Sequence, residues 1–88
     1  MLCLLIENNM DDFKFEIINE IGVLSSTKKG WTLELNRVSW NGKEAKYDIR
    51  QWSPDHTKMG RGITLTEEEL RGLSKLLNKE IAFLDEEE

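Results

Sequence analysis

The sequence predicts an α+β protein in which a four-stranded curved antiparallel sheet is followed by one C-terminal helix, in the order ββββα. Four segments between residues 13 and 65 alternate apolar and polar residues, which is typical of strands that bury one face. Turn-forming residues separate these segments, so neighbouring strands are expected to be antiparallel. A capping motif and an apolar stripe then predict the helix. A chain of 88 residues buries a limited core, which favours a homodimer.

The chain is expected to form one domain over residues 11–84. Residues 1–10 precede the alternating segments and are predicted to be an N-terminal extension, whose apolar run is too short to cross a bilayer. Residues 85–88 are all acidic and are predicted to form a solvated tail. The lone cysteine, Cys3, excludes an internal disulfide and fits a reducing, cytoplasmic compartment, with no membrane partner.

The first two strands are predicted at residues 13–23 and 31–40. The first strand alternates cleanly at its start and is expected to bend near residues 19–22. In the second strand the apolar positions change phase, from odd numbers up to Leu35 to even numbers from Val38. Such a change predicts either a bulge in this second strand or a sharp coil of the sheet, and hence a curved sheet.

Turn signals define the remaining strands. Asn41-Gly42 is a strong hairpin signal, because both residues tolerate a positive φ. It connects the second strand to a third at residues 44–53. A turn at residues 54–60 then leads to a short fourth strand at residues 61–65.

The helix is predicted from Thr66, which can form a capping box with Glu69. Three glutamates in its first turn also suit the positive end of the helix dipole. Its apolar stripe is expected to cover one face of the sheet and to contribute to the dimer contact. This stripe consists of Leu70, Leu73, Leu76, Leu77, Ile81 and Leu84.

The distribution of charge suggests a nucleic-acid partner. The net charge of the chain is −5, but residues 28–65 carry +4 between two acidic flanks. Salt screens exposed charges beyond about 10 Å, so a ligand responds mainly to this local balance. Double-stranded DNA fits less well, because the predicted helix begins with acidic residues and cannot serve as a basic recognition helix.

The third strand carries both cations and an aromatic ring on one face. Alternation places Tyr47 and Ile49 on one side, where they can join a core, and Lys46, Arg50 and Trp52 on the other. Cations beside an exposed indole suit single-stranded nucleic acid, whose bases stack and whose phosphates attract lysine and arginine. Trp52 is therefore expected at the surface. The candidate nucleic-acid-binding residues are Lys28, Lys29, Arg37, Trp40, Lys43, Lys46, Arg50, Trp52, Lys58 and Arg61.

No residue pattern indicates catalysis, a cofactor or a metal site. The one histidine, His56, lies in a predicted turn and is expected to be a solvated polar residue. No serine or cysteine nucleophile lies in a recognisable motif, and no cluster of metal ligands is evident. Gly60-Arg61-Gly62 lacks the lysine and hydroxyl residue of a phosphate-binding loop. The protein is thus expected not to be an enzyme.

The segment Asp48-Ile49-Arg50-Gln51-Trp52, a Pro-Asp turn, and then Gly62-Ile63-Thr64-Leu65 before a capped helix form a fairly specific combination. This combination resembles the transcriptional coactivator "positive cofactor four" (PC4-like) family, especially its short bacterial YdbC-like members. The resemblance covers most of the chain. It implies a curved sheet, a homodimer and binding of single-stranded DNA with little sequence preference. It also implies binding roles for Trp40, Lys43, Arg50, Trp52 and Arg61.

The chain departs from the eukaryotic members of that family in two respects. The loop after Trp52 is shorter, and a Lys-Pro step is replaced by Lys58-Met59. The serine-rich regulatory segment is absent, so the resemblance implies a minimal binding module associated with transcription or DNA maintenance. It does not imply a full coactivator role.

Other functions also fit the sequence. The exposed face of the sheet could recognise a partner protein, in which case the basic region would be incidental. Single-stranded RNA likewise offers phosphates and bases that can stack. A sugar-binding sheet or a small hydrolase could also use tryptophans, but a glycan gains nothing from Arg50, and no acid–base pair is evident.

Overall fold

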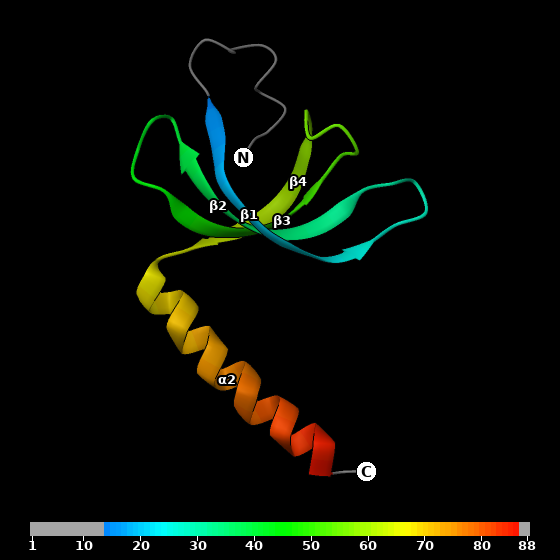
Figure 1. The fold of residues 1–88 in the computed structure, drawn as a ribbon, viewed down its shortest axis with the longest axis vertical. Helices are drawn as coiled ribbons and strands as arrows, with labels where there is room; N and C mark the ends of the chain where they lie inside the picture. Colours follow the sequence, from blue (N-terminus) through cyan, green and yellow to red (C-terminus); the bar gives the residue numbers. More distant parts are fainter. Residues whose placement is uncertain (1–13, 87–88) are drawn as a thin grey trace.

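The computed structural model describes residues 14–86. One antiparallel sheet contains the strands in chain order, and a single long helix follows it (Figure 1). The predicted ββββα order is confirmed, whereas the predicted extension at residues 1–10 lies outside the described residues. The elements are β1 (Phe15–Ser26), β2 (Thr32–Trp40), β3 (Lys46–Trp52), β4 (Met59–Leu65) and α2 (Glu67–Glu86).

The sheet is strongly curved, and the bulges that accompany this curvature lie in β1. Its pairing with β2 skips one residue of β1 at each of three places, leaving Ile18, Ile21 and Leu24 without direct partners. The predicted bend near residues 19–22 is therefore confirmed. The pairing of β2 with β3 is unbroken, so the bulge predicted in the second strand is wrong. The apolar phase of β2 changes because Leu35 and Val38 lie on opposite faces of a regular strand.

The β2–β3 hairpin has the predicted turn. Asn41 and Gly42 have φ angles of 54° and 77°, and the Lys43 amide donates to the Trp40 carbonyl at 3.0 Å. Asn41 also connects the turn to the start of β1. Its amide donates to the Lys14 carbonyl at 2.7 Å, and its side-chain oxygen accepts from the Lys14 amide at 2.7 Å.

The predicted capping box begins α2. The Thr66 amide donates to Glu69 Oε1 at 2.9 Å, and the Glu69 amide donates to Thr66 Oγ1 at 3.1 Å. The helix continues through Asp85 to Glu86, so the first half of the predicted acidic tail is helical. The rest of that predicted tail, residues 87–88, lies outside the described residues.

The helix extends away from the sheet (Figure 1). Among the strands it approaches only β3 and β4, and none of its residues is buried. The expectation that its apolar stripe covers one sheet face is therefore wrong for the single chain, since Leu77 and Ile81 are 50% and 51% exposed. Within residues 14–86 no helix has both the length and the apolar character needed to cross a membrane.

Candidate nucleic-acid interface

The register of the sheet determines which side chains share its concave face. Glu34 pairs with Arg50, Asn36 with Asp48, and Thr32 with Trp52, so the even-numbered residues of β2 and β3 lie together. The prediction that Arg50 and Trp52 share one side of β3 is confirmed. The prediction that Tyr47 and Ile49 form the core side is wrong, because the fully buried residues of β3, Asp48 and Trp52, lie on the opposite side. We call the set Glu34, Asn36, Asp48 and Arg50 the polar floor of the concave face.

Trp52 is buried, contrary to the prediction that it is exposed. Its relative exposure is 0%, because two other aromatic side chains pack against it. The Phe15 ring lies 5.3 Å from the indole at 52°, and the His56 ring lies 5.5 Å away at 25°. The Trp52 Nε1–H has no hydrogen-bond partner in the part of the chain that the structure describes. The strong curvature of the sheet brings the start of β1 close to the end of β3, which the alternation of a single strand does not reveal.

Four rings form what we call the aromatic cluster: Phe15, Trp40, Trp52 and His56. Phe15 also lies 6.1 Å from Trp40, so it connects the two tryptophans. Phe15, Trp40 and His56 are only partly buried. These three rings therefore form the accessible part of the cluster, and the buried Trp52 packs against Phe15 and His56.

Arg50 is not a free cation. Its Nε and Nη2 donate to Asp48 at 2.9 Å each, and its Nη1 donates to the Gly60 carbonyl at 3.0 Å. The carboxylate of Asp48 is completely buried, and the Arg50 side chain is 12% exposed. The guanidinium also lies 5.1 Å from the Trp40 ring centre, within the range of a cation–π contact. Arg50 therefore connects Asp48 of the polar floor with Trp40 of the aromatic cluster.

His56 is not a solvated turn residue, and that expectation is wrong. Its φ of 60° turns the chain back over the sheet, so that Nε2 lies 2.9 Å from Glu34 Oε2. The preceding residue stabilises this loop: Asp55 Oδ1 accepts from Ser53 Oγ at 2.9 Å and from Thr57 Oγ1 at 2.7 Å. Hydrogen bonds from Thr57 and Ser53 lower the pKa of Asp55 from 3.8 to about 2. The only sequence signal for this turn is the Pro-Asp step, which does not show where the imidazole points.

Glu34 makes the polar floor acidic. Burial raises the pKa of its carboxyl, but hydrogen bonds from Asn36, Thr32 and His56, together with the charge of His56, outweigh this effect and lower the pKa below 4.5. Because Arg50 is already paired with Asp48, the Glu34 charge is the one on the floor that no lysine or arginine among the described residues neutralises. Glu34 and Val38 are both at even positions of β2, which suggests that Glu34 lies on the same side of the strand as the apolar Val38. The alternation of β2 alone does not show which side is buried.

The other predicted cations do not form one cluster. Lys28, Lys29, Lys43 and Lys58 are exposed in the loops between strands, and Lys46 is exposed at the start of β3. Arg37 pairs with Tyr47 and lies on the convex face, and Arg61 lies in the bulge of β4 opposite Gln51. No contact in residues 14–86 tests whether any of them binds nucleic acid, so these roles stay predictions.

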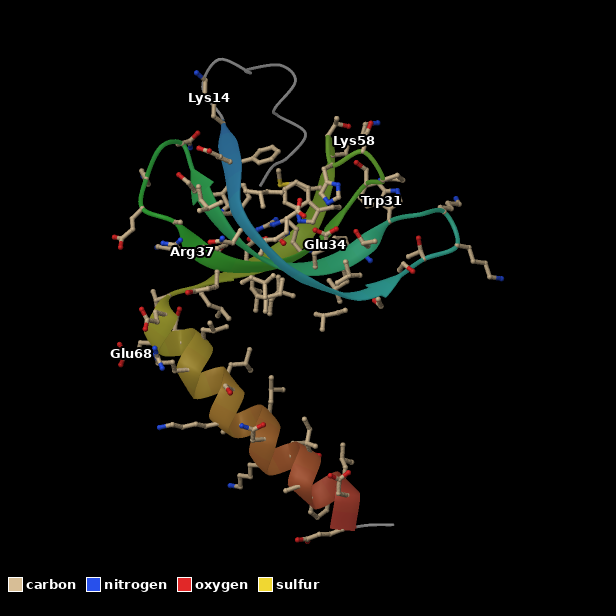
Figure 2. The ribbon with its side chains drawn as sticks, viewed as in Figure 1. Lys14, Trp31, Glu34, Arg37, Lys58 and Glu68 are labelled. Carbon is tan, nitrogen blue, oxygen red and sulfur yellow. The ribbon has the colours of Figure 1, made fainter. Side chains whose placement is uncertain are left out.

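Lys14 is a further candidate that sequence reasoning missed. Its backbone is fixed by Asn41, and Figure 2 shows Lys14 at the start of β1 and Lys58 beside the β3–β4 loop, both at the rim of the concave face. Lys14 lies one residue before β1, and β1 pairs with β2 of the Asn-Gly hairpin. Its place beside the site can therefore be predicted only when the order of the strands in the sheet is known.

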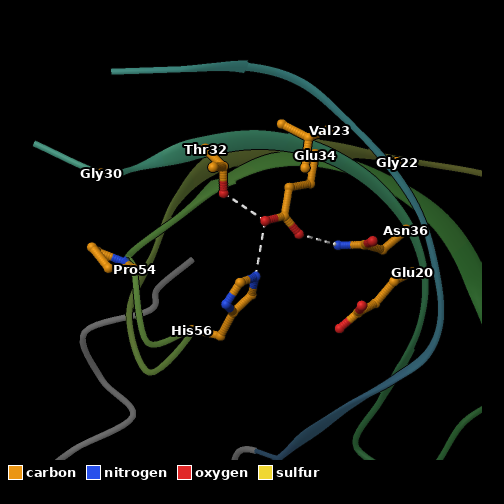
Figure 3. A pocket seen from close by; sticks show the side chains of 9 residues that line it. All are labelled: Glu20, Gly22, Val23, Gly30, Thr32, Glu34, Asn36, Pro54 and His56. Atoms are coloured by element: carbon orange, nitrogen blue, oxygen red, sulfur yellow. Dashed lines mark hydrogen bonds and ion pairs between the residues drawn. The ribbon is translucent and has the colours of Figure 1, made fainter. Parts of the chain in front are cut away.

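A cavity of about 420 Å³ lies on the concave side, between the bulged part of β1 and the loop that carries His56 (Figure 3). Its polar lining consists of Glu20, Thr32, Glu34, Asn36 and His56. Within residues 14–86 no group of three or more histidine, cysteine, aspartate or glutamate side chains is arranged to hold a metal ion.

Comparison with known proteins identifies the family of the chain. The family model described as Transcriptional Coactivator p15 (PC4) matches residues 27–76, from the β1–β2 loop to the middle of α2. The chain belongs to the PC4 family. The match includes the whole polar floor and both tryptophans of the aromatic cluster. An uncharacterized protein of Treponema pallidum (strain Nichols) is 54% identical over 68 residues, which are 77% of this chain and 80% of that relative. The resemblance inferred from the Asp-Ile-Arg strand is thereby confirmed.

Proposed function

We propose that this PC4-family protein is a non-enzymatic single-stranded DNA-binding protein of the cytoplasm, that it has little sequence preference, and that it acts as a homodimer. One observation carries the proposal: the concave face of the sheet holds the aromatic cluster, and the exposed lysines Lys14 and Lys58 lie at its rim. Aromatic rings that bases can stack on, together with cations that follow the phosphates, are the two parts of a sequence-tolerant single-strand site.

The polar floor favours one orientation of a bound DNA strand. Glu34 is ionised and buried at the bottom of the concave face, so it repels phosphate groups from the floor. The lysines at the rim, which include Lys14 and Lys58, attract them instead. A bound strand would then lie with its phosphates at the rim and its bases turned toward Phe15, Trp40 and His56.

The homodimer is supported by the apolar surface that the single chain leaves exposed. Ile63 on β4 is 54% exposed, and along α2 the exposed fractions of Leu77 and Ile81 are similar. A helix gains most of its stability from packing an apolar face, and an unpacked stripe of this length is typical of an oligomer contact. A second copy of the chain supplies a matching stripe.

The central test is a fluorescence titration of the protein with oligo(dT) at low and high salt. Trp40 is partly buried in the proposed site, so stacking of bases is expected to quench tryptophan emission. Affinity should fall steeply with salt, because a single strand contributes a slope of about −0.7 for each phosphate neutralised. Quenching that is absent at low salt, or that is unaffected by salt, contradicts the proposal.

Competitors separate the alternatives. Double-stranded DNA is expected to compete weakly, because its bases are not available for stacking. Oligo(rU) tests whether the site distinguishes RNA from DNA. If neither oligonucleotide binds, the concave face is better explained as a surface that recognises a partner protein.

A further inference from the structure

His56 lies between the aromatic cluster and the polar floor. The Trp52 ring stacks on its imidazole at 5.5 Å, and its Nε2 lies 2.9 Å from Glu34 Oε2. The chain also turns at this residue, where φ is 60°. The stack, the hydrogen bond and the turn together fix the ring over the concave face. There the side chain remains 37% exposed and lines the cavity of Figure 3.

The bond to Glu34 determines which ring nitrogen can gain a proton. Glu34 is ionised, and an ionised carboxylate only accepts hydrogen bonds, so Nε2 carries the hydrogen that lies between them. In the neutral ring the other nitrogen, Nδ1, is then an acceptor. Nδ1 has no hydrogen-bond partner among residues 14–86. Protonation of His56 therefore adds a positive charge and a new N–H donor at Nδ1.

His56 is the side chain of the described concave face that can change its charge near neutral pH, because histidine titrates between about pH 5 and pH 8. Arg50 is neutralised by Asp48, and the lowered pKa values of Glu34 and Asp55 keep both carboxylates ionised in that range. Protonation of His56 thus cancels the negative charge that Glu34 leaves on the polar floor. The charged groups around the imidazole are Glu20 of β1, Glu34 of β2, Asp48 and Arg50 of β3, and Asp55 and Lys58 of its own loop.

From these observations we infer that His56 is a DNA-binding residue that acts in its protonated form, so that binding of a single strand is coupled to the uptake of a proton from solvent at Nδ1. This inference rests on the proposed single-stranded DNA binding. The imidazolium offsets the repulsion between Glu34 and the phosphates, and its Nδ1–H donates to a phosphate oxygen. Phosphate groups are the same in every nucleotide, so this contact adds affinity without adding sequence preference.

The test measures the affinity for labelled oligo(dT) by fluorescence anisotropy, at fixed salt, between about pH 8 and about pH 6. The affinity of the wild-type protein is expected to rise about fivefold as the pH falls, since a unit charge 4 Å from a phosphate contributes about 1 kcal/mol in water. His56→Asn should bind with little dependence on pH. Asparagine tolerates the positive φ and can still donate to Glu34, but it never becomes charged.

Two further measurements do not depend on how well the His56→Asn protein folds. Glu34→Gln removes the charge that protonation of His56 cancels, so at about pH 8 it should bind about as tightly as the wild-type protein binds at about pH 6. The chain contains one histidine, so its imidazole signals in an NMR spectrum need no assignment. Their titration midpoint should move to higher pH when oligo(dT) is bound, because linkage is reciprocal.

The remaining outcomes overturn the inference. Equal pH dependence in the wild-type protein and in His56→Asn assigns the proton to another group, such as the amino terminus, and leaves the proposed function intact. A histidine midpoint that is the same with and without oligo(dT) does so too, as does an affinity that falls on acidification. If oligo(dT) binds at no pH, both the proposed function and this inference fail.

Discussion

The guanidinium of Arg50 is already hydrogen-bonded within its own sheet. A guanidinium that donates to Asp48 and to the Gly60 carbonyl has few donors left for a phosphate. The sequence correctly predicts that Arg50 and Trp52 share a face, because alternation is local. It does not show that an acidic neighbour two residues away, on that same face, neutralises the cation. For Arg50 the structure therefore favours a positioning role.

Replacing Arg50 by alanine is expected to reduce the free energy of unfolding by about 3–5 kcal/mol, because it leaves the buried Asp48 carboxylate without a partner. Urea denaturation measures this loss. Arg61→Ala is the control, since Arg61 is exposed, and it should change the stability by less than about 0.5 kcal/mol. A stable Arg50→Ala protein that has lost its salt-dependent DNA binding would instead indicate that Arg50 contacts phosphate directly.

The carboxylates of Glu34 and Asp55 should make the protein acid-sensitive. Their pKa values in the folded protein lie below the ordinary values of 4.5 and 3.8. Both groups therefore stabilise the fold fully above those values, and this contribution is lost as the pH falls through the lowered pKa values. The urea midpoint is expected to decline from about pH 5 downward. Glu34→Gln should flatten the upper part of this decline. A midpoint that stays constant to pH 3 would contradict the assignment.

The elements differ in how far the sequence predicts them. The Asn41-Gly42 turn and the Thr66 capping box depend on neighbouring residues, and both are found where predicted. Of the three bulges of β1, only the one at Ile21 lies within the bend predicted at residues 19–22. The bulges at Ile18 and Leu24 become visible only from the pairing with β2. The site is least predictable, since His56 reaches Glu34 across 22 residues.

A substitution at Gly62 tests how closely β4 approaches β3. A Cβ atom at this position would collide with Arg50 and with the Ile49 carbonyl, and backbone cannot move aside cheaply. Gly62→Ala is therefore expected to cost about 1–3 kcal/mol of stability. Gly72→Ala in α2 meets no atom within 4 Å and should stabilise the helix by about 0.5–1 kcal/mol. Thermal unfolding of both variants checks this contrast, and a neutral Gly62→Ala would show that the strands separate more easily than the structure indicates.

For the whole molecule, the described residues form a curved sheet and a helix that share few contacts. The small size of the chain already predicted a limited core. It did not predict that α2 leaves its apolar stripe uncovered, because the amphipathic pattern of a helix does not specify whether its partner belongs to the same chain. A dimer would complete the packing that the single chain lacks.

The oligomeric state can be tested by changing this stripe. Leu77→Glu places a charge in the proposed contact and is expected to convert a dimer into a monomer, halving the mass measured by sedimentation equilibrium. Lys75→Glu alters the charge of the same helix outside the stripe and should leave the dimer intact. A wild-type protein that is monomeric at micromolar concentration would exclude the proposed homodimer.

The three bulges of β1 have a consequence beyond curvature. This strand forms one edge of the sheet, and Val23 and Leu24 on it are 61% and 63% exposed. A flat apolar edge of this kind invites other chains to add to it, which is how fibrils and amorphous aggregates begin. The repeated bulges interrupt the regular spacing of free amides and carbonyls on that edge, which disfavours the addition of another chain there although apolar side chains are exposed.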